Sequence, residues 1–194
     1  MTGKTHVAIG VAAALTISYN QPVESQLVLV TSAAIGSLIP DLDHPKGKLN
    51  QKLLLINNNF YRALFYLSIS SIFMYLYYRM GNKIFMLLSL VSCLVGISSH
   101  RSFTHSIIGF LLASSIIKMG TLKFNLPSIY TGFVVGYALH LIADSFNPKG
   151  IRLFYPIKAN ISFPITIKTN SKAEKTIFLL LSIYCICLLF NYLR

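Results

Sequence analysis

Residues 126–144 read LPSIYTGFVVGYALHLIAD, an apolar run that ends in a histidine and an aspartate four positions apart. The apolar residues do not alternate with polar ones, as they do in a half-buried strand, so the run predicts a helix. Positions i and i+4 share one helical face, and His140 and Asp144 can therefore converge on one ion at the inner end of this helix. Taken alone, the pair predicts a hydrogen bond between the two side chains as readily as a pair of metal ligands.

Six further apolar runs accompany this one, and the composition shows the class of protein. Hydrophobic residues make up 54% of the 194 residues and charged residues only 11%, which excludes a soluble domain. We expect an all-α, polytopic transmembrane bundle of about six or seven spans, in one domain over residues 1–194, with helices at 7–19, 24–39, 63–78, 84–99, 103–118, 126–144 and 176–193. A full crossing needs about 20 apolar residues, so the first two segments could instead form a tilted hairpin or a re-entrant pair.

All five histidines stand at the ends of these runs, and seven crossings would place all of them on one side of the membrane. Ionisable groups kept at a membrane edge usually bind an ion, relay protons or do chemistry. The same side carries most of the basic residues, which predicts a cytoplasmic orientation. They are Lys4, Lys46, Lys48, Lys52, Arg62, Arg101, Lys149, Arg152, Lys158, Lys168, Lys172 and Lys175, against Arg79, Lys83, Lys118, Lys123 and Arg194 on the other side.

The motif PDLDH places Asp41, Asp43 and His44 within four positions, between Pro40 and Pro45. Both prolines stop helices and stiffen the turn. Two carboxylates this close raise each other's proton affinity unless a cation lies between them, which indicates a metal site. A solvated loop with an aspartate capping a turn is the alternative.

The motif HRSFTHS places His100 and His105 five positions apart, about 140° apart on a regular helix. Both can face one site only if the segment is irregular or a helix begins within it, with Ser102 or Thr104 as the N-cap. The candidate ligands then number eight: His6, Asp41, Asp43, His44, His100, His105, His140 and Asp144. Eight nitrogen and oxygen ligands suit two ions, or one ion with a second layer of supporting residues, and favour zinc, manganese or iron.

The net charge of +12 has two interpretations. Topology signals and attraction to anionic lipid headgroups explain most of it. Alternatively, Arg101, Lys4 or Lys149 binds an anionic group of a substrate. The basic residues are dispersed over loops without a recognition module, so we expect no nucleic acid as a partner. Residues 145–175 form a polar, proline-containing stretch that predicts an interfacial loop or a short pair of strands before the last helix.

Together the four motifs resemble the membrane-bound, metal-dependent hydrolases of the YdjM type. The resemblance rests on Thr5 and His6, on Pro40 to His44, on His100 to Ser106, and on His140 with Asp144, Gly150 and Pro156. It covers residues 1–156 and leaves 157–194 without support. The family pattern is distantly similar to the ligand patterns of zinc-dependent phospholipase C and P1-type nucleases.

The resemblance implies a hydrolase that uses a metal-activated water at the cytoplasmic face, and no nucleophile elbow is recognisable in the chain. Asp41 or Asp43 would be the base or a bridging carboxylate, and Arg101 would stabilise an anion. We expect a phosphoester on a membrane lipid or amphiphile as the substrate. A metal-binding transporter or channel component and a non-catalytic, metal-stabilised scaffold are the alternatives.

Overall fold

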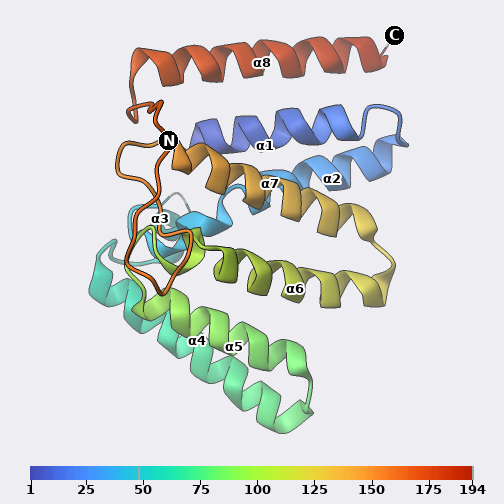
Figure 1. Cartoon of the computed structure of the whole chain (residues 1–194). Helices are drawn as coiled ribbons and strands as arrows, with labels where there is room; N and C mark the ends of the chain where they lie inside the picture. Colours follow the sequence, from blue (N-terminus) through green and yellow to red (C-terminus); the bar gives the residue numbers. More distant parts are fainter. Residues whose placement is uncertain (48, 194) are drawn as a thin grey trace.

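The computed structural model describes residues 1–47 and 49–193, so Lys48 and Arg194 of the predicted charge asymmetry lie outside the described residues. The described chain is all-helical, as predicted (Figure 1). Its seven long helices are α1 (Gly3–Ile17), α2 (Val23–Gly36), α4 (Asn59–Met80), α5 (Lys83–Ile97), α6 (Ile107–Phe124), α7 (Pro127–Ser145) and α8 (Lys172–Leu193). The short elements are α3 (Asn50–Leu53) and two 3-10 segments, η1 (Ile39–Asp43) and η2 (Phe103–His105).

The long helices correspond one by one to the expected ranges, but they differ in their capacity to cross a bilayer. Two segments, Val23–Asp43 and Lys172–Asn191, are long and apolar enough to span, and three others, Gly3–Ile17, Lys83–Ile97 and Ile107–Leu122, are apolar but shorter. In α8 the large side chains of Leu179, Leu180 and Phe190 are exposed, as expected for a helix in contact with lipid. Six or seven full crossings therefore stay a prediction.

The helices lie side by side, and the two ends of the bundle differ (Figure 1). One end holds the short connections from α1 to α2, from α4 to α5 and from α6 to α7. The opposite end holds the N-terminus, η1, α3, η2 and the loop that joins α7 to α8. All four histidine-containing motifs lie at this second end, which is called the motif end below.

Helix α7 lies at the centre of the bundle and packs against α1, α2 and α6. Glycines allow α2 and α7 to approach closely, because a Cβ atom on Gly132 would lie 2.3 Å from Leu29 O, and one on Gly136 would lie 2.1 Å from Ala33 O. A Cβ on Gly36 of α2 would similarly lie 2.5 Å from Phe133 O. Small residues four apart are typical of tightly packed membrane helices. This contact places the end of α2 directly beside His140.

Helix α6 begins later than the sequence indicated. Its N-cap is Ser106, whose Oγ accepts a hydrogen bond from Gly109 N at 3.1 Å. The prediction that Ser102 or Thr104 caps this helix is wrong, since Thr104 lies in η2 and its hydroxyl is used elsewhere. The 3-10 turn before the cap brings His100 and His105 to the same region, although residues five apart would face different directions on a regular α-helix.

The loop between α7 and α8 contains no regular strand in its described residues, only an isolated antiparallel bridge between Ile151 and Ile161. Residues 146–171 therefore form a loop, whereas residues 172–175 of the expected range belong to α8. The location of this loop at the membrane interface stays a prediction. Tyr155 of the loop packs edge-to-face on Phe103, with ring centroids 6.1 Å apart. The backbone of Leu153 accepts a hydrogen bond from Ile107 N at 3.0 Å, which attaches the loop to the start of α6.

We expect the variant Gly136→Val to destabilise the protein by about 3 kcal/mol, because its side chain would collide with the backbone of α2. Thermal unfolding of the detergent-solubilised protein measures this loss. Gly120→Ala is the matched control, since a Cβ at Gly120 of α6 meets no atom within 4 Å. Alanine there should be neutral or stabilising by up to about 1 kcal/mol. Equal melting temperatures for the two variants would contradict the close packing of α2 and α7.

Candidate metal centre

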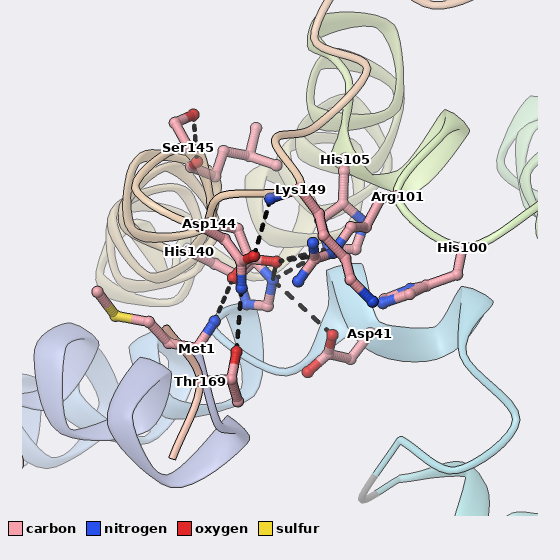
Figure 2. Close-up of polar contacts among 12 residues, drawn as sticks. Met1, Asp41, His100, Arg101, His105, His140, Asp144, Ser145, Lys149 and Thr169 are labelled. Atoms are coloured by element: carbon pink, nitrogen blue, oxygen red, sulfur yellow. Dashed lines mark hydrogen bonds and ion pairs between the residues drawn. The ribbon is translucent and has the colours of Figure 1, made fainter. Parts of the chain in front are cut away.

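Six of the eight candidate ligands form two adjacent groups at the motif end. Figure 2 labels all of them except His6. The first ligand group is His6, His140 and Asp144, and the second ligand group is Asp41, His100 and His105. Within each group one ligand atom from every residue lies within 4.8 Å of the others. The groups adjoin, because His140 Nε2 lies 3.3 Å from His105 Nε2 and 3.9 Å from Asp41 Oδ1.

The first ligand group is buried and pre-oriented. His140 Nδ1 lies 2.7 Å from Ser37 O, so the Nδ1–H donates to this carbonyl at the end of α2 and leaves Nε2 free as a ligand. The four-residue spacing works as predicted, with His140 Nε2 3.9 Å from Asp144 Oδ2. His6 stacks on His140 with ring centroids 3.8 Å apart, and its Nε2 lies 3.2 Å from Asp144 Oδ1.

Asp43 orients the histidines of the second ligand group. Its Oδ1 lies 2.7 Å from His100 Nδ1, and its Oδ2 lies 3.3 Å from His105 Nδ1. Its Oδ2 also accepts hydrogen bonds from Arg101 N at 2.8 Å and from Thr104 Oγ1 at 2.7 Å. A carboxylate bound to Nδ1 directs Nε2 toward an ion and raises the basicity of the ring. Asp43 therefore orients two candidate ligands through their Nδ1 atoms, whereas the sequence predicted that Asp43 itself is a ligand.

Asp41 and Asp43 point apart because they lie on a 3-10 turn. Residues two apart in such a turn are separated by about 240°, so one cation cannot easily bind both. Asp41 joins the second ligand group, and Asp43 does not. His44 lies in neither group: its Nδ1 accepts a hydrogen bond from Lys46 N at 3.2 Å, and its ring contacts the edge of His100 at a centroid distance of 4.5 Å.

The carboxylates around His105 favour a positive charge on its ring. Complete burial lowers the pKa of the His105 imidazole, but the carboxylates of Asp43 and Asp144 outweigh this effect and raise the pKa to about 10. His105 Nε2 lies 3.5 Å from Asp144 Oδ2, so His105 links the groups. At the margin of the site, burial and the neighbouring His100 lower the pKa of His44.

Two cations also contact Asp144. The amino group of Met1 donates to Asp144 Oδ1 at 2.6 Å, and Arg101 Nε lies 3.8 Å from Asp144 Oδ2. Arg101 has a positive φ of 64°, which is uncommon for a residue with a side chain. The strained backbone holds the Arg101 guanidinium beside the ligand groups, where the sequence analysis expected an anion-binding residue.

Arg62 is a site residue that the sequence analysis assigned to the charged loops. Its side chain is buried, and the guanidinium donates hydrogen bonds to Asp43 O and, at 2.8 Å, to Ser98 O. It thus joins η1 to the end of α5. In the sequence, Arg62 stands in the first turn of an apolar helix, where an arginine that binds lipid headgroups would stay exposed. This position was the only feature that distinguished Arg62 from the other basic residues, and it did not indicate burial.

Glu174 is a second residue that the sequence analysis missed. It is buried at the start of α8 and accepts hydrogen bonds from Thr2 N at 2.5 Å, from Thr5 Oγ1 at 2.8 Å and from Asn170 N at 2.6 Å. These bonds join α8 to the beginning of α1, directly before His6. An acidic residue at the start of an otherwise apolar helix was the only signal in the sequence.

The donor set fits a divalent metal ion. Both ring nitrogens of His6 are buried and make no hydrogen bond among the described residues, and the only charged contact of Nε2 there is the Asp144 carboxylate at 3.2 Å, an arrangement that leaves room for an ion as the partner. Imidazole nitrogens with carboxylate oxygens suit zinc, manganese or iron. The first ligand group offers three donors to one ion, and the second offers three to another, so the arrangement accommodates one or two ions.

Comparisons with known proteins agree with a membrane location. The profile of the YdjM inner membrane protein family matches residues 1–194, which includes the tail that the motifs left unsupported. Inner membrane protein YdjM of Escherichia coli is 26% identical over 194 residues, with 96% of this chain and 82% of that protein covered. The protein YvsG of Bacillus subtilis is 27% identical over 177 residues, with 91% and 87% covered. No solved structure gives a significant match.

We expect Asp43→Asn to weaken metal binding about 10- to 100-fold, because a carboxamide cannot accept from all the donors that surround Asp43 and so leaves His100 and His105 less well oriented. Competition with a chromophoric chelator measures the affinity. Glu24→Gln, which removes the same charge from an exposed position at the start of α2, is the control and should bind metal normally. Unchanged affinity in Asp43→Asn would show that Asp43 does not support the ligands.

Proposed function

The chain belongs to the YdjM inner membrane protein family, and from this membership and the geometry of the two ligand groups we propose that it is a membrane-embedded, metal-dependent hydrolase. Its proposed substrate is a phosphoester carried on a lipid or amphiphile. The observation that carries the proposal is the convergence of three histidines and Asp144, from α1, η2 and α7, on one buried space. Asp43 contacts the Nδ1 atoms of His105, which is one of these three, and of His100. Structural packing alone does not require so many oriented donors.

A bound divalent ion would activate water and stabilise the charge on a phosphoryl oxygen. Residues of the chain would supply the base and bind the anionic substrate. The Asp41 side chain is 22% exposed and the Asp43 side chain is fully buried, so Asp41 is the better candidate for a base that takes a proton from water. Arg101 is one of the two cations that contact Asp144, and its guanidinium would bind the anionic substrate and neutralise charge as it develops.

The distribution of buried charge favours this hydrolase over a transporter. Among the described residues, the buried histidine, arginine and acidic side chains are His6, Asp43, Arg62, His105, His140, Asp144 and Glu174. All seven lie at the motif end, near the ends of their helices. A route for ions across the membrane would need such groups at several depths. A site confined to one surface instead suits a reaction on a headgroup.

The hydrolase proposal predicts that His140→Ala and Asp144→Asn each remove both the bound metal and the turnover of a phosphoester panel. Elemental analysis of the purified protein and phosphate release with and without chelator measure the two losses. Lys83→Gln, at the start of α5 on the far end of the bundle, is the control and should retain both. If metal-dependent turnover persists in either variant, the replaced residue is not a metal ligand. Bound metal without turnover of any phosphoester would favour the non-catalytic scaffold.

We also propose that the motif end faces the cytoplasm, since it carries most of the basic residues. In a background with Cys93, Cys185 and Cys187 replaced by serine, Lys158→Cys in the α7–α8 loop should react with an impermeant maleimide only in inverted vesicles. Asn20→Cys, in the turn between α1 and α2, should react only in right-side-out vesicles if these helices cross the membrane. Labelling of Asn20→Cys from the cytoplasmic side would identify a re-entrant pair, and labelling of Lys158→Cys from outside would reverse the orientation.

A further inference from the structure

A basic cavity opens next to the second ligand group. Its volume is about 360 Å³, and its lining consists of polar residues and one glycine: His44, His100, Arg101, Lys149, Gly150, Arg152 and Asn160. Arg101, Lys149 and Arg152 carry fixed positive charges, and no acidic residue is part of the lining. A concave surface with one sign of charge concentrates ions of the opposite sign. The basic cavity is therefore suited to an anion.

The basic cavity adjoins a neighbouring cavity of about 350 Å³, since Arg101 and Lys149 line both. The second cavity adds Lys168 and the polar side chains of Asn147 and Thr169. Figure 2 shows Lys149 and Arg101 next to one another at the edge of the ligand groups. The positive charge thus extends from His100 along the α7–α8 loop to Lys168.

Backbone hydrogen bonds hold the basic residues in these positions. Arg152 N donates to Arg101 O at 3.1 Å, which joins the loop to the HRSFTHS segment. Gly150 has a positive φ of 61°, and a Cβ there would lie 2.6 Å from Ile161 O. Ile151 and Ile161 exchange two hydrogen bonds, at 3.0 and 2.8 Å, directly after this glycine. Lys149 and Arg152 are therefore placed on either side of a tightly constrained turn.

The guanidinium of Arg101 makes no hydrogen bond within the described part of the chain, although its Nε lies 3.8 Å from Asp144 Oδ2. Its Nε and Nη1 atoms are buried and make no hydrogen bond among the described residues. Buried donors are nearly always satisfied by protein, water or ligand, and arginine binds phosphate in a bidentate manner. The unused donors lie at the boundary between the ligand groups and the basic cavity, where an anion contacting both would reach them.

We propose that the basic cavity is a second phosphate subsite and that the substrate carries two linked phosphoryl groups, as in an organic diphosphate. This inference rests on the proposed function. Two divalent ions held with Asp41 and Asp144 would have a net charge of about +2, which would balance the one phosphoryl dianion being attacked. The three further positive charges of Arg101, Lys149 and Arg152 exceed what a phosphomonoester needs and match an adjoining phosphoryl group.

The reaction then removes the terminal phosphate. Water adds to the terminal phosphorus, the bond from this phosphorus to the bridging oxygen breaks, and the electron pair stays on the bridging oxygen. A diphosphate ester trianion and water become a monophosphate ester dianion, a hydrogen phosphate dianion and one proton, which passes through Asp41 to solvent. Arg101, Lys149 and Arg152 bind the phosphate that remains on the organic product.

Anion binding to the full-length, metal-loaded protein tests the second subsite. Calorimetry with inorganic pyrophosphate and with inorganic phosphate should give an affinity at least 100-fold higher for pyrophosphate, with the protein-bound metal counted before and after titration. Lys149→Gln and Arg152→Gln should each weaken pyrophosphate binding about tenfold and change phosphate binding less than twofold. Lys158→Gln, in the same loop but outside both cavities, is the matched control and should change neither.

A second measurement needs no variant. Pyrophosphate should protect Lys149 from an amine-acylating reagent, detected by mass spectrometry, while the exposed Lys158 stays reactive. Methyl diphosphate and a long-chain alkyl diphosphate in micelles distinguish the source of the ligand. If the long-chain ester binds more tightly than methyl diphosphate, the substrate is an amphiphile. If the two esters bind with equal affinity, the substrate is soluble. Both results are consistent with a second phosphate subsite.

The failures of the two proposals are separable. A protein that holds metal but binds phosphate and pyrophosphate equally, or in which Lys149 stays reactive at saturating pyrophosphate, contradicts only the second subsite. A protein that holds no metal contradicts the proposed hydrolase itself.

Discussion

The buried carboxylate of Asp43 accepts hydrogen bonds from donors on η2 and on the segment before it, while the guanidinium of Arg62 holds its carbonyl oxygen. This single aspartate joins the PDLDH motif to the HRSFTHS motif. A buried carboxylate is costly unless its charge and hydrogen-bonding capacity are satisfied, and here several donors converge on it. Because the same two oxygens contact His100 Nδ1 and His105 Nδ1, the interaction that stabilises the motif end also orients its candidate ligands.

The close packing of α2 against α7 supplies the other half of this arrangement. Gly132 and Gly136 have no side chains to keep the two helices apart, so the end of α2 lies next to His140. The carbonyl oxygen of Ser37 can therefore accept a hydrogen bond from the Nδ1–H of His140. The 3-10 turn η1 follows at once and brings Asp41 Oδ1 to 3.9 Å from His140 Nε2. A larger residue at Gly136 would therefore disturb the candidate metal centre through the backbone, although it contacts no candidate ligand.

The sequence allowed the seven helices, the motif end and the pair of His140 and Asp144 to be predicted, because long apolar runs and a four-residue spacing have direct geometric meaning. It did not separate the roles of Asp41 and Asp43. Both stand in one PDLDH motif, and only the 3-10 geometry, which residue spacing does not reveal, turns them in different directions. Arg62 was misjudged for a related reason, since its acceptors, Asp43 O and Ser98 O, are distant in sequence.

The two ligand groups differ in exposure, and this difference assigns them different parts in the proposed reaction. In the first ligand group the side chains of His6 and His140 are at most 1% exposed, which suits a permanently bound ion. In the second ligand group the side chain of His100 is 33% exposed, and that residue also lines the basic cavity. A substrate anion can therefore approach only the second group directly. Asp43 orients both His100 and His105, and His105 also contacts Asp144 of the buried first group. An ion in the second group would therefore be held by ligands whose orientation depends on buried carboxylates, and a substrate anion that reaches this group from the basic cavity would lie next to this ion.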